Sequence, residues 1–286
     1  MKWLRRILVA LGLLLLVLAG VVVAVGVPPS WGAGAILHPS RRPVGPPPAL
    51  PHRDVVVESG GVTLKGWFFP AEGSPRRITV VYLHGSADNR DSGNWIAERL
   101  VPKGFDVLAY DGRGHGESTG TFCSYGVFEK QDLRRVLDAV GVRRALLIGG
   151  SLGAAVALQA APDDPRVIGV VAASTFSDLA TIARDRAPLT MREGQIREAF
   201  ALVEKQAGFA VADASPVRAA SRIHVPVLVI HGAEDRETSA EHSKRVYAAL
   251  AGPKTLRIVE GAGHNGPLTM VWGEVEKWIE EVAATP

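Results

Sequence analysis

Ser151 lies at the centre of the sequence Gly-Gly-Ser-Leu-Gly, residues 149–153, and its hydroxyl group could act as a nucleophile. One apolar run precedes this motif at residues 145–148, and another follows it at residues 154–158. The order predicts a strand, a sharp turn and a helix, the setting that exposes a nucleophilic serine at the edge of a sheet. The motif alone has weak specificity in a chain with 31 glycines, so the chemistry requires partner residues elsewhere.

A serine hydroxyl is a weak nucleophile near neutral pH and needs a histidine base that a carboxylate orients. Asp235 follows the apolar run at residues 227–232, and His264 follows the next apolar run at residues 255–259. In open α/β folds, ligands bind at the carboxyl ends of the strands. Ser151, Asp235 and His264 therefore form a candidate catalytic triad in the order nucleophile, acid, histidine. Glu234 is adjacent to Asp235 and is the alternative acid.

The elements that must position these residues alternate along the chain. Apolar strand-like runs separated by helical patterns predict an α/β fold with a mostly parallel central sheet and helices on both faces. The expected strands are 78–83, 105–110, 145–148, 167–172, 225–230 and 255–259, and the expected helices are 94–101, 128–140, 152–160, 239–250 and 270–282.

Two further segments complete the predicted domain at residues 54–286. Residues 54–58 and 63–69 are strand-like around a Ser-Gly-Gly turn, which indicates an antiparallel pair. Residues 174–221 interrupt the alternation with two helix-like stretches, at 177–186 and 192–207. We expect this segment to form a small helical lid.

Four sequence patches carry a resemblance to a known family. They are Leu-His-Gly-Ser at 83–86, Asp-Gly-Arg-Gly-His-Gly-Glu-Ser at 111–118, the motif around Ser151, and the pair of segments His-Gly-Ala-Glu-Asp at 231–235 and Gly-His at 263–264. Over about residues 54–284 the sequence resembles the α/β-hydrolase superfamily, and within it the BEM46-like and serine-aminopeptidase-like groups. The resemblance implies the α/β-hydrolase fold and a serine hydrolase.

The resemblance also implies a role for each candidate residue. Ser151 would be the nucleophile, His264 the general base and then acid, and Asp235 the orienting carboxylate, because the family spacing of four residues from His231 favours Asp235 over Glu234. The backbone N–H groups of Leu152 and Ser86 would form the oxyanion hole. No cofactor and no metal is implied. Related enzymes often have Val-Pro two residues after the acid, where this chain has Glu-Thr.

Other polar residues near the predicted sheet edge have structural interpretations. His84 and His231 each end a strand-like run, and we expect them to bond nearby loops. Asp111 and Arg113 are expected to pair with each other and hold their glycine-rich loop.

The N-terminal part predicts an uncleaved membrane anchor; the alternative is a cleaved signal peptide, whose apolar region is usually shorter, about 7 to 15 residues. Residues 1–6 are a basic cytoplasmic tail, residues 7–27 an uncharged apolar segment long enough to span a bilayer, and residues 28–53 a Pro/Gly-rich extended stalk. The positive-inside rule would place the catalytic domain on the periplasmic or extracellular side.

Charge distribution argues against nucleic acid as a partner. The chain has 32 basic and 29 acidic side chains, and residues 1–53 hold six of the basic ones and none of the acidic ones. The remaining residues hold 26 basic and 29 acidic groups, so the domain carries a net charge of about −3.

The sequence therefore predicts a single-pass membrane serine hydrolase, carboxylesterase-like or lipase-like, that cleaves a small-molecule ester, including lipid-like acyl esters and thioesters, through an acyl-enzyme. The same triad could serve an aminopeptidase or amidase, for which Glu193, Glu198 and Glu204 are candidate lid groups that would hold a substrate amine. The fold also serves non-catalytic ligand-binding proteins.

Overall fold

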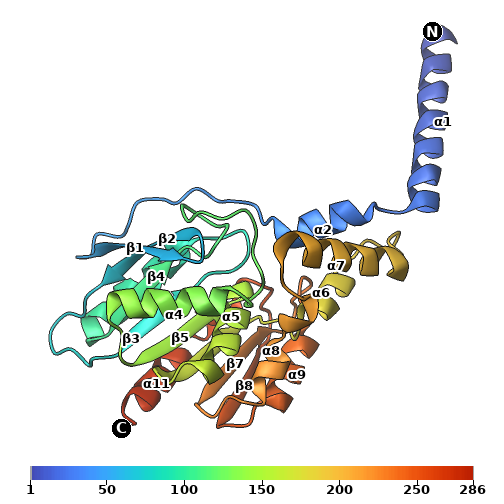
Figure 1. The fold of residues 1–286 in the computed structure, drawn as a ribbon. Helices are drawn as coiled ribbons and strands as arrows, with labels where there is room; N and C mark the ends of the chain where they lie inside the picture. Colours follow the sequence, from blue (N-terminus) through green and yellow to red (C-terminus); the bar gives the residue numbers. More distant parts are fainter. Residues whose placement is uncertain (1, 286) are drawn as a thin grey trace.

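The computed structural model describes the backbone of residues 2–285 and the side chains of residues 3–15 and 26–285. A central eight-stranded sheet has the order β1-β2-β4-β3-β5-β6-β7-β8 (Figure 1). β1 and β2 pair antiparallel to each other, β2 pairs antiparallel to β4, and all pairs from β4 to β8 are parallel. The strands are β1 (Arg53–Ser59), β2 (Val62–Phe69), β3 (Thr79–Leu83), β4 (Asp106–Tyr110), β5 (Ala145–Gly150), β6 (Val167–Ala173), β7 (Val227–Gly232) and β8 (Lys254–Val259).

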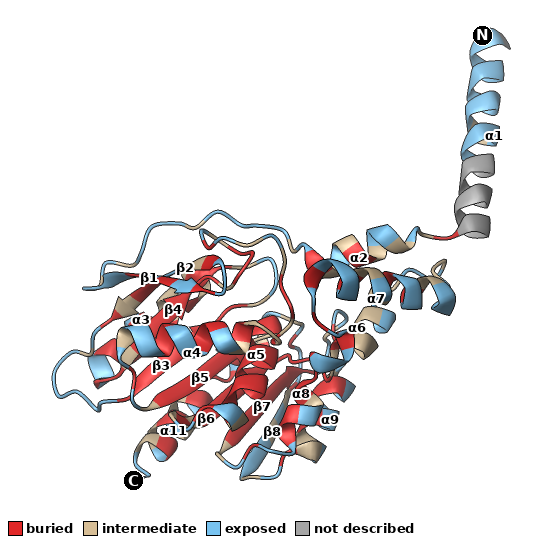
Figure 2. Cartoon of the chain, in the orientation of Figure 1, coloured by how far each residue is buried: buried red, intermediate tan, exposed pale blue. Residues whose placement is uncertain are grey.

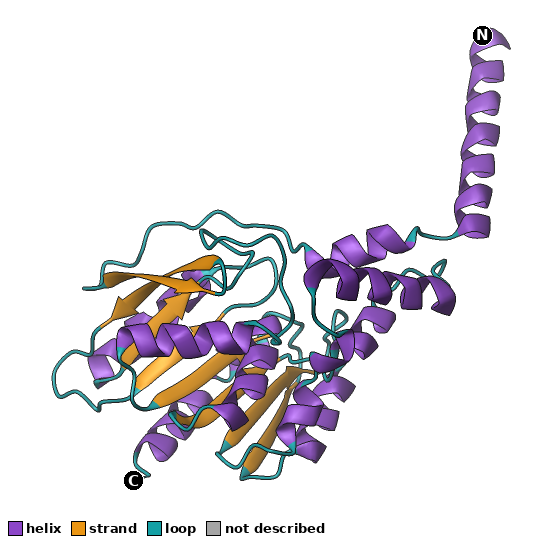
Figure 3. Cartoon of the chain, viewed as in Figure 1, coloured by secondary structure: helices purple, strands orange, loops and turns teal. Residues whose placement is uncertain are grey.

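Helices cover both faces of this sheet (Figure 3). One apolar core lies between the sheet and α4, α5, α8 and α9, and a second lies between the opposite face and α3, α10 and α11. The helices are α1 (Lys2–Val25), α2 (Pro29–Leu37), α3 (Asn94–Leu100), α4 (Glu129–Val140), α5 (Leu152–Ala160), α6 (Leu179–Asp185), α7 (Glu193–Ala207), α8 (Pro216–Ala220), α9 (Ala240–Ala249), α10 (Pro267–Met270) and α11 (Trp272–Ala283), with short 3-10 helices at Arg90–Gly93, Val101–Lys103, Ala161–Asp163 and Val211–Asp213. The predicted fold class is confirmed.

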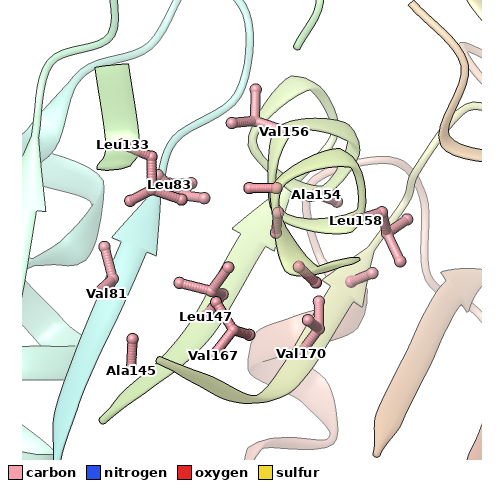
Figure 4. Packing of buried hydrophobic residues seen from close by; sticks show 14 of the residues in the cluster. Val81, Leu83, Leu133, Ala145, Leu147, Ala154, Val156, Leu158, Val167 and Val170 are labelled. Atoms are coloured by element: carbon pink, nitrogen blue, oxygen red, sulfur yellow. The ribbon is translucent and has the colours of Figure 1, made fainter. Parts of the chain in front are cut away.

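The central strands are buried on both faces, which explains their continuous apolar sequences (Figure 2). In β3, Val81 and Leu83 point to the side of α5, whereas Val80 and Tyr82 belong to the core on the other face. Figure 4 shows Ala154 of α5 above this layer, close to the strands. The side chains of α5 are small, so this helix can approach the sheet closely at its N-terminal end, next to Ser151.

The expected lid, residues 174–221, contains α6, α7 and α8. α6 and α7 pack in one apolar cluster with α2, whereas α8 packs on the face of the sheet with α5 and α9. The predicted stalk differs from the structure, because residues 29–37 form helix α2 and lie against α7. Ala33 and Leu37 of α2 are buried in the apolar cluster of the lid. Burial of this face stabilises a short helix whose glycines and proline had suggested extended chain.

The predicted membrane anchor requires a correction. Among the residues that the structure describes, no helix is long and apolar enough to cross a membrane. The predicted span, residues 7–27, falls largely on α1, and its residues 16–25 lie outside the described side chains. The prediction of a single-pass membrane protein with an exported catalytic domain is wrong on this finding.

Candidate active site

Ser151 occupies a strained turn between β5 and α5. Its backbone has φ 50° and ψ −110°, a conformation that a residue with a side chain rarely adopts. The backbone N–H of Ser151 donates to the carbonyl oxygen of Ala173 at the end of β6, at 2.8 Å. The neighbouring strand therefore holds the turn in place, and the hydroxyl group lies at the carboxyl edge of the sheet.

Close backbone contacts explain two of the three glycines around Ser151. A Cβ atom on Gly153 would lie 1.9 Å from the carbonyl oxygen of Leu83, and one on Gly149 would lie 2.4 Å from the backbone of Gly153. A Cβ atom on Gly150 would meet nothing within 4 Å. The first and last glycines of the motif are therefore steric requirements of the strand–turn–helix packing, whereas the middle one borders open space.

Asp235 and His264 meet in the loops that follow β7 and β8. His264 Nδ1 donates to Asp235 Oδ2 at 2.7 Å. The other oxygen, Asp235 Oδ1, accepts from the backbone N–H groups of Glu237 and Thr238, both at 2.9 Å. Burial would raise the pKa of Asp235, but the hydrogen bonds from His231, His264 and the Thr238 N–H outweigh burial and hold the pKa below its ordinary value. The carboxylate is therefore ionised at neutral pH.

His231 is a contact of Asp235 that the sequence interpretation missed. It is fully buried, and its Nε2 lies 3.1 Å from Asp235 Oδ2 and 2.8 Å from the Thr238 carbonyl oxygen. Neither acceptor can donate, so Nε2 carries a proton. Its Nδ1 lies 2.6 Å from Ser243 Oγ of α9. The expectation that His231 bonds a nearby loop is correct, but the loop is the one that carries the acid.

Further contacts fix the two loops relative to the sheet. Ser174, which follows β6 with φ 52°, donates from Oγ to the carbonyl oxygen of His264 at 2.8 Å. The Glu234 backbone N–H donates to the Ala262 carbonyl at 2.9 Å, and a Cβ atom on Gly232 would lie 2.3 Å from that same carbonyl oxygen. The side chain of Glu234, the alternative acid, is exposed, whereas Asp235 is the carboxylate that bonds to His264.

A cavity of about 520 Å³ opens beside Ser151 and His264. Its walls are mostly polar, and they include Ser86 of the expected oxyanion hole. Charged side chains of both signs contribute to it, and Tyr82, Trp95 and Leu268 add apolar surface. The lining residues are Arg42, Tyr82, Gly85, Ser86, Ala87, Asp88, Ser92, Trp95, Gly150, Ser151, Ala173, Ser174, Arg186, Glu237, His264, Asn265, Pro267, Leu268 and Thr269. Glu193, Glu198 and Glu204, the lid carboxylates considered for an aminopeptidase, do not line this cavity.

The expected Asp111–Arg113 pair is replaced by two longer-range pairs. Asp111 accepts from the Arg90 guanidinium at 2.6 Å, and Arg113 donates to both oxygens of Asp132 at 2.7 and 2.8 Å. His84 accepts from a backbone N–H of the same loop at 2.9 Å, as its structural interpretation expects. Within the described part of the chain, no three His, Cys, Asp or Glu side chains cluster so that they could hold a metal ion.

Comparison with known proteins places this site in a family. The model of the alpha/beta hydrolase family matches residues 80–285, which is most of the chain. The chain belongs to the α/β hydrolase family. Among its relatives are an uncharacterised protein of Mycobacterium tuberculosis, Rv2307c, with 32% identity over 239 residues (81% of this chain and 80% of the relative), and the uncharacterised protein YfhR of Escherichia coli, with 28% identity over 249 residues (83% and 82%).

Solved structures agree with this assignment for the α/β hydrolase fold. The esterase Pf2001 of Pyrococcus furiosus superposes with a TM-score of 0.66 at 23% identity, over 86% of this chain and 97% of the esterase. A hydrolase from Pseudomonas aeruginosa superposes with a TM-score of 0.60 at 25% identity, over 83% and 100%. The narrower resemblance to BEM46-like and serine-aminopeptidase-like groups stays a prediction.

Proposed function

We propose that this α/β hydrolase is a serine carboxylesterase in which Ser151 is the nucleophile, His264 the general base and acid, and Asp235 the orienting carboxylate. The observation that carries the proposal is the 2.7 Å hydrogen bond between His264 and Asp235, made beside a cavity that Ser151 also lines. The esterase of Pyrococcus furiosus among the structural neighbours supports an ester as substrate.

Asp235 sets the tautomer of His264 in this mechanism. Because the carboxylate only accepts, the His264 Nδ1 carries a proton and Nε2 is free to take one from Ser151 Oγ. Oγ attacks the ester carbonyl carbon, a C–O bond forms, and the carbonyl π electrons move to the carbonyl oxygen. The tetrahedral intermediate collapses, the alcohol leaves with the proton from His264, and an acyl-enzyme remains. Water, deprotonated by the same ring, attacks the acyl carbon. The bond from this carbon to Ser151 Oγ then breaks, Oγ takes the proton back from His264, and the carboxylic acid leaves.

The negative charge on the carbonyl oxygen requires two hydrogen-bond donors. Leu152 is the first residue of α5, where a backbone N–H has no acceptor within its helix, and the helix N-terminus favours negative charge. The Ser86 backbone N–H follows β3 beside the same cavity. We assign these two N–H groups to the oxyanion, and each would lower the barrier by about 3 kcal/mol.

Covalent labelling tests the nucleophile. A fluorophosphonate probe should label the wild-type protein and leave Ser151→Ala unlabelled. Ser92→Ala is the matched control, since Ser92 is another hydroxyl on the cavity wall, bonded to Asp88. This variant should label as the wild type does. The proposal is wrong if the wild type is not labelled, or if Ser151→Ala is labelled equally. p-Nitrophenyl esters set against aminoacyl anilides then distinguish an esterase from a peptidase.

A further inference from the structure

A second pocket lies within the lid and differs in chemistry from the catalytic cavity. This lid pocket has a volume of about 190 Å³ and is lined by α2, α6, α7, the loop between α6 and α7, and Tyr125. Its walls are apolar except for Tyr125 and Arg186. The Tyr125 hydroxyl already donates to the carbonyl oxygen of Ile36 at 2.9 Å, so this group needs no ligand.

Small side chains create the space in the lid pocket. Gly32 and Ala35 contribute from α2, Ala183 from α6 and Ala199 from α7, while Phe200 supplies a larger apolar wall. In Figure 1, α2 and α7 lie side by side with α6 next to them. The segment preceding the hydrolase domain therefore builds one wall of the pocket.

Arg186 lies between the lid pocket and the catalytic cavity and lines both. Its guanidinium donates from Nε to the Glu237 carbonyl oxygen at 3.1 Å and from Nη2 to Thr238 Oγ1 at 2.9 Å. Long cationic side chains commonly place an aliphatic stem along apolar surface and a charged head in a polar region. The polar catalytic cavity and the apolar lid pocket are therefore adjacent, with Arg186 at their common wall.

We propose that the lid pocket binds the acyl chain of the substrate, and this inference rests on the proposed esterase function. A cavity of about 150 Å³ holds benzene, so 190 Å³ corresponds to a chain of roughly six to eight carbons. The polar catalytic cavity, which Arg42, Asp88 and Asn265 line, suits the polar alcohol portion of the ester. The substrate class is a medium-chain acyl ester of a polar alcohol.

A chain-length series tests the inference. kcat/KM for p-nitrophenyl esters from acetate to decanoate is measured for the wild type, Ala199→Phe and Ala183→Leu. Octanoate has six more methylene groups than acetate, each worth up to about fourfold when fully buried, so full burial of only two or three of them should raise kcat/KM about 30-fold. Both variants fill the lid pocket and should lose tenfold or more on octanoate, with acetate within about threefold of the wild type. Ala201→Phe is the matched control: the same substitution at an exposed position of α7, expected to act like the wild type.

The outcomes separate this inference from the proposed function. If no ester is hydrolysed, the esterase proposal itself fails. If esters are hydrolysed but acetate and octanoate have equal kcat/KM, the lid pocket is not the acyl site. The same conclusion follows if Ala199→Phe and Ala183→Leu, folded by circular dichroism, keep the octanoate preference. Loss of that preference in either folded variant, with acetate hydrolysis retained, supports the assignment.

Discussion

Substitution of Asp235 by Asn tests the hydrogen-bond logic of the site most directly. Oδ1 of Asp235 accepts two backbone N–H groups, from Glu237 and Thr238, and Oδ2 accepts from His264 and His231. In Asp235→Asn, the amide oxygen keeps the two backbone donors, so the NH₂ group faces the histidines. His264 Nδ1 must then accept a hydrogen bond, which moves its proton to Nε2. The ring could no longer take a proton from Ser151.

The expected loss is about 10⁴-fold in kcat, the size of effect that a wrong tautomer has in a serine triad, or about 5.5 kcal/mol of barrier. The fold should survive. Confronting the new NH₂ with the protonated Nε2 of His231 costs roughly 1–3 kcal/mol of unfolding free energy. Steady-state hydrolysis of a p-nitrophenyl ester measures kcat, and thermal unfolding measures stability.

Glu234→Gln is the matched control, because it removes the neighbouring carboxylate that the sequence alone offers as the alternative acid. Its side chain is exposed, so kcat should remain within about twofold of the wild type. The reasoning is refuted if Asp235→Asn retains more than a tenth of wild-type kcat while folded, or if Glu234→Gln loses as much activity as Asp235→Asn.

Three further predictions follow from the packing and charges of the site. Gly153→Ala places a Cβ atom 1.9 Å from the Leu83 carbonyl oxygen and should lower the free energy of unfolding by more than about 4 kcal/mol. Gly150→Ala, whose Cβ atom meets nothing, should unfold at the wild-type temperature. Equal melting temperatures for the two variants would contradict this packing. His231→Leu should lower kcat by about 10- to 100-fold with little change in KM, and His231→Gln, which keeps an N–H donor, should recover most of it. The folded-state pKa of Asp235 is depressed, so the stabilising contribution of its carboxylate is present above the unfolded pKa near 3.8 and is lost as pH falls below that value. In urea titrations between pH 5 and 2, acid should therefore destabilise the wild type more than Asp235→Asn. Parallel curves of unfolding free energy against pH for the two proteins would disprove the depressed pKa.

The positions of the three residues proposed for catalysis could be predicted from the sequence because each depends on local signals. Ser151, Asp235 and His264 each follow an apolar strand, and parallel strands place their carboxyl ends at one edge. The packing requirement at Gly149 is also local, since a Cβ atom there would meet the first turn of the helix that follows its strand, whereas the requirement at Gly153 comes from Leu83 of the neighbouring strand β3. The spacing of residues in the sequence is therefore enough to predict the turn at Ser151 and the proximity of Asp235 to His264.

The partners of the buried polar side chains could not be predicted in this way. Asp111 pairs with Arg90, 21 residues away at the start of a 3-10 helix, although Arg113 is closer in sequence. The contact of His231 with Asp235 depends on the loop folding back so that the Thr238 carbonyl meets the same nitrogen. The sequence alone does not identify these contacts, because the tertiary arrangement of the loops determines the partners of a buried polar group.

The segment before the family-matched region has the largest consequence for function. The family model begins at residue 80, but Arg42 lines the catalytic cavity and α2 forms a wall of the lid pocket. Neighbouring contacts hold this segment to the domain: Arg41 donates to the carbonyl oxygens of the loop at residues 116–120, and Asn89 donates to the carbonyls of Arg42 and Pro43. The family-matched region supplies the residues proposed for catalysis, while surfaces proposed to contact the substrate come partly from the segment before it. Relatives that keep the triad but differ before residue 80 should therefore differ in substrate choice, rather than in reaction chemistry.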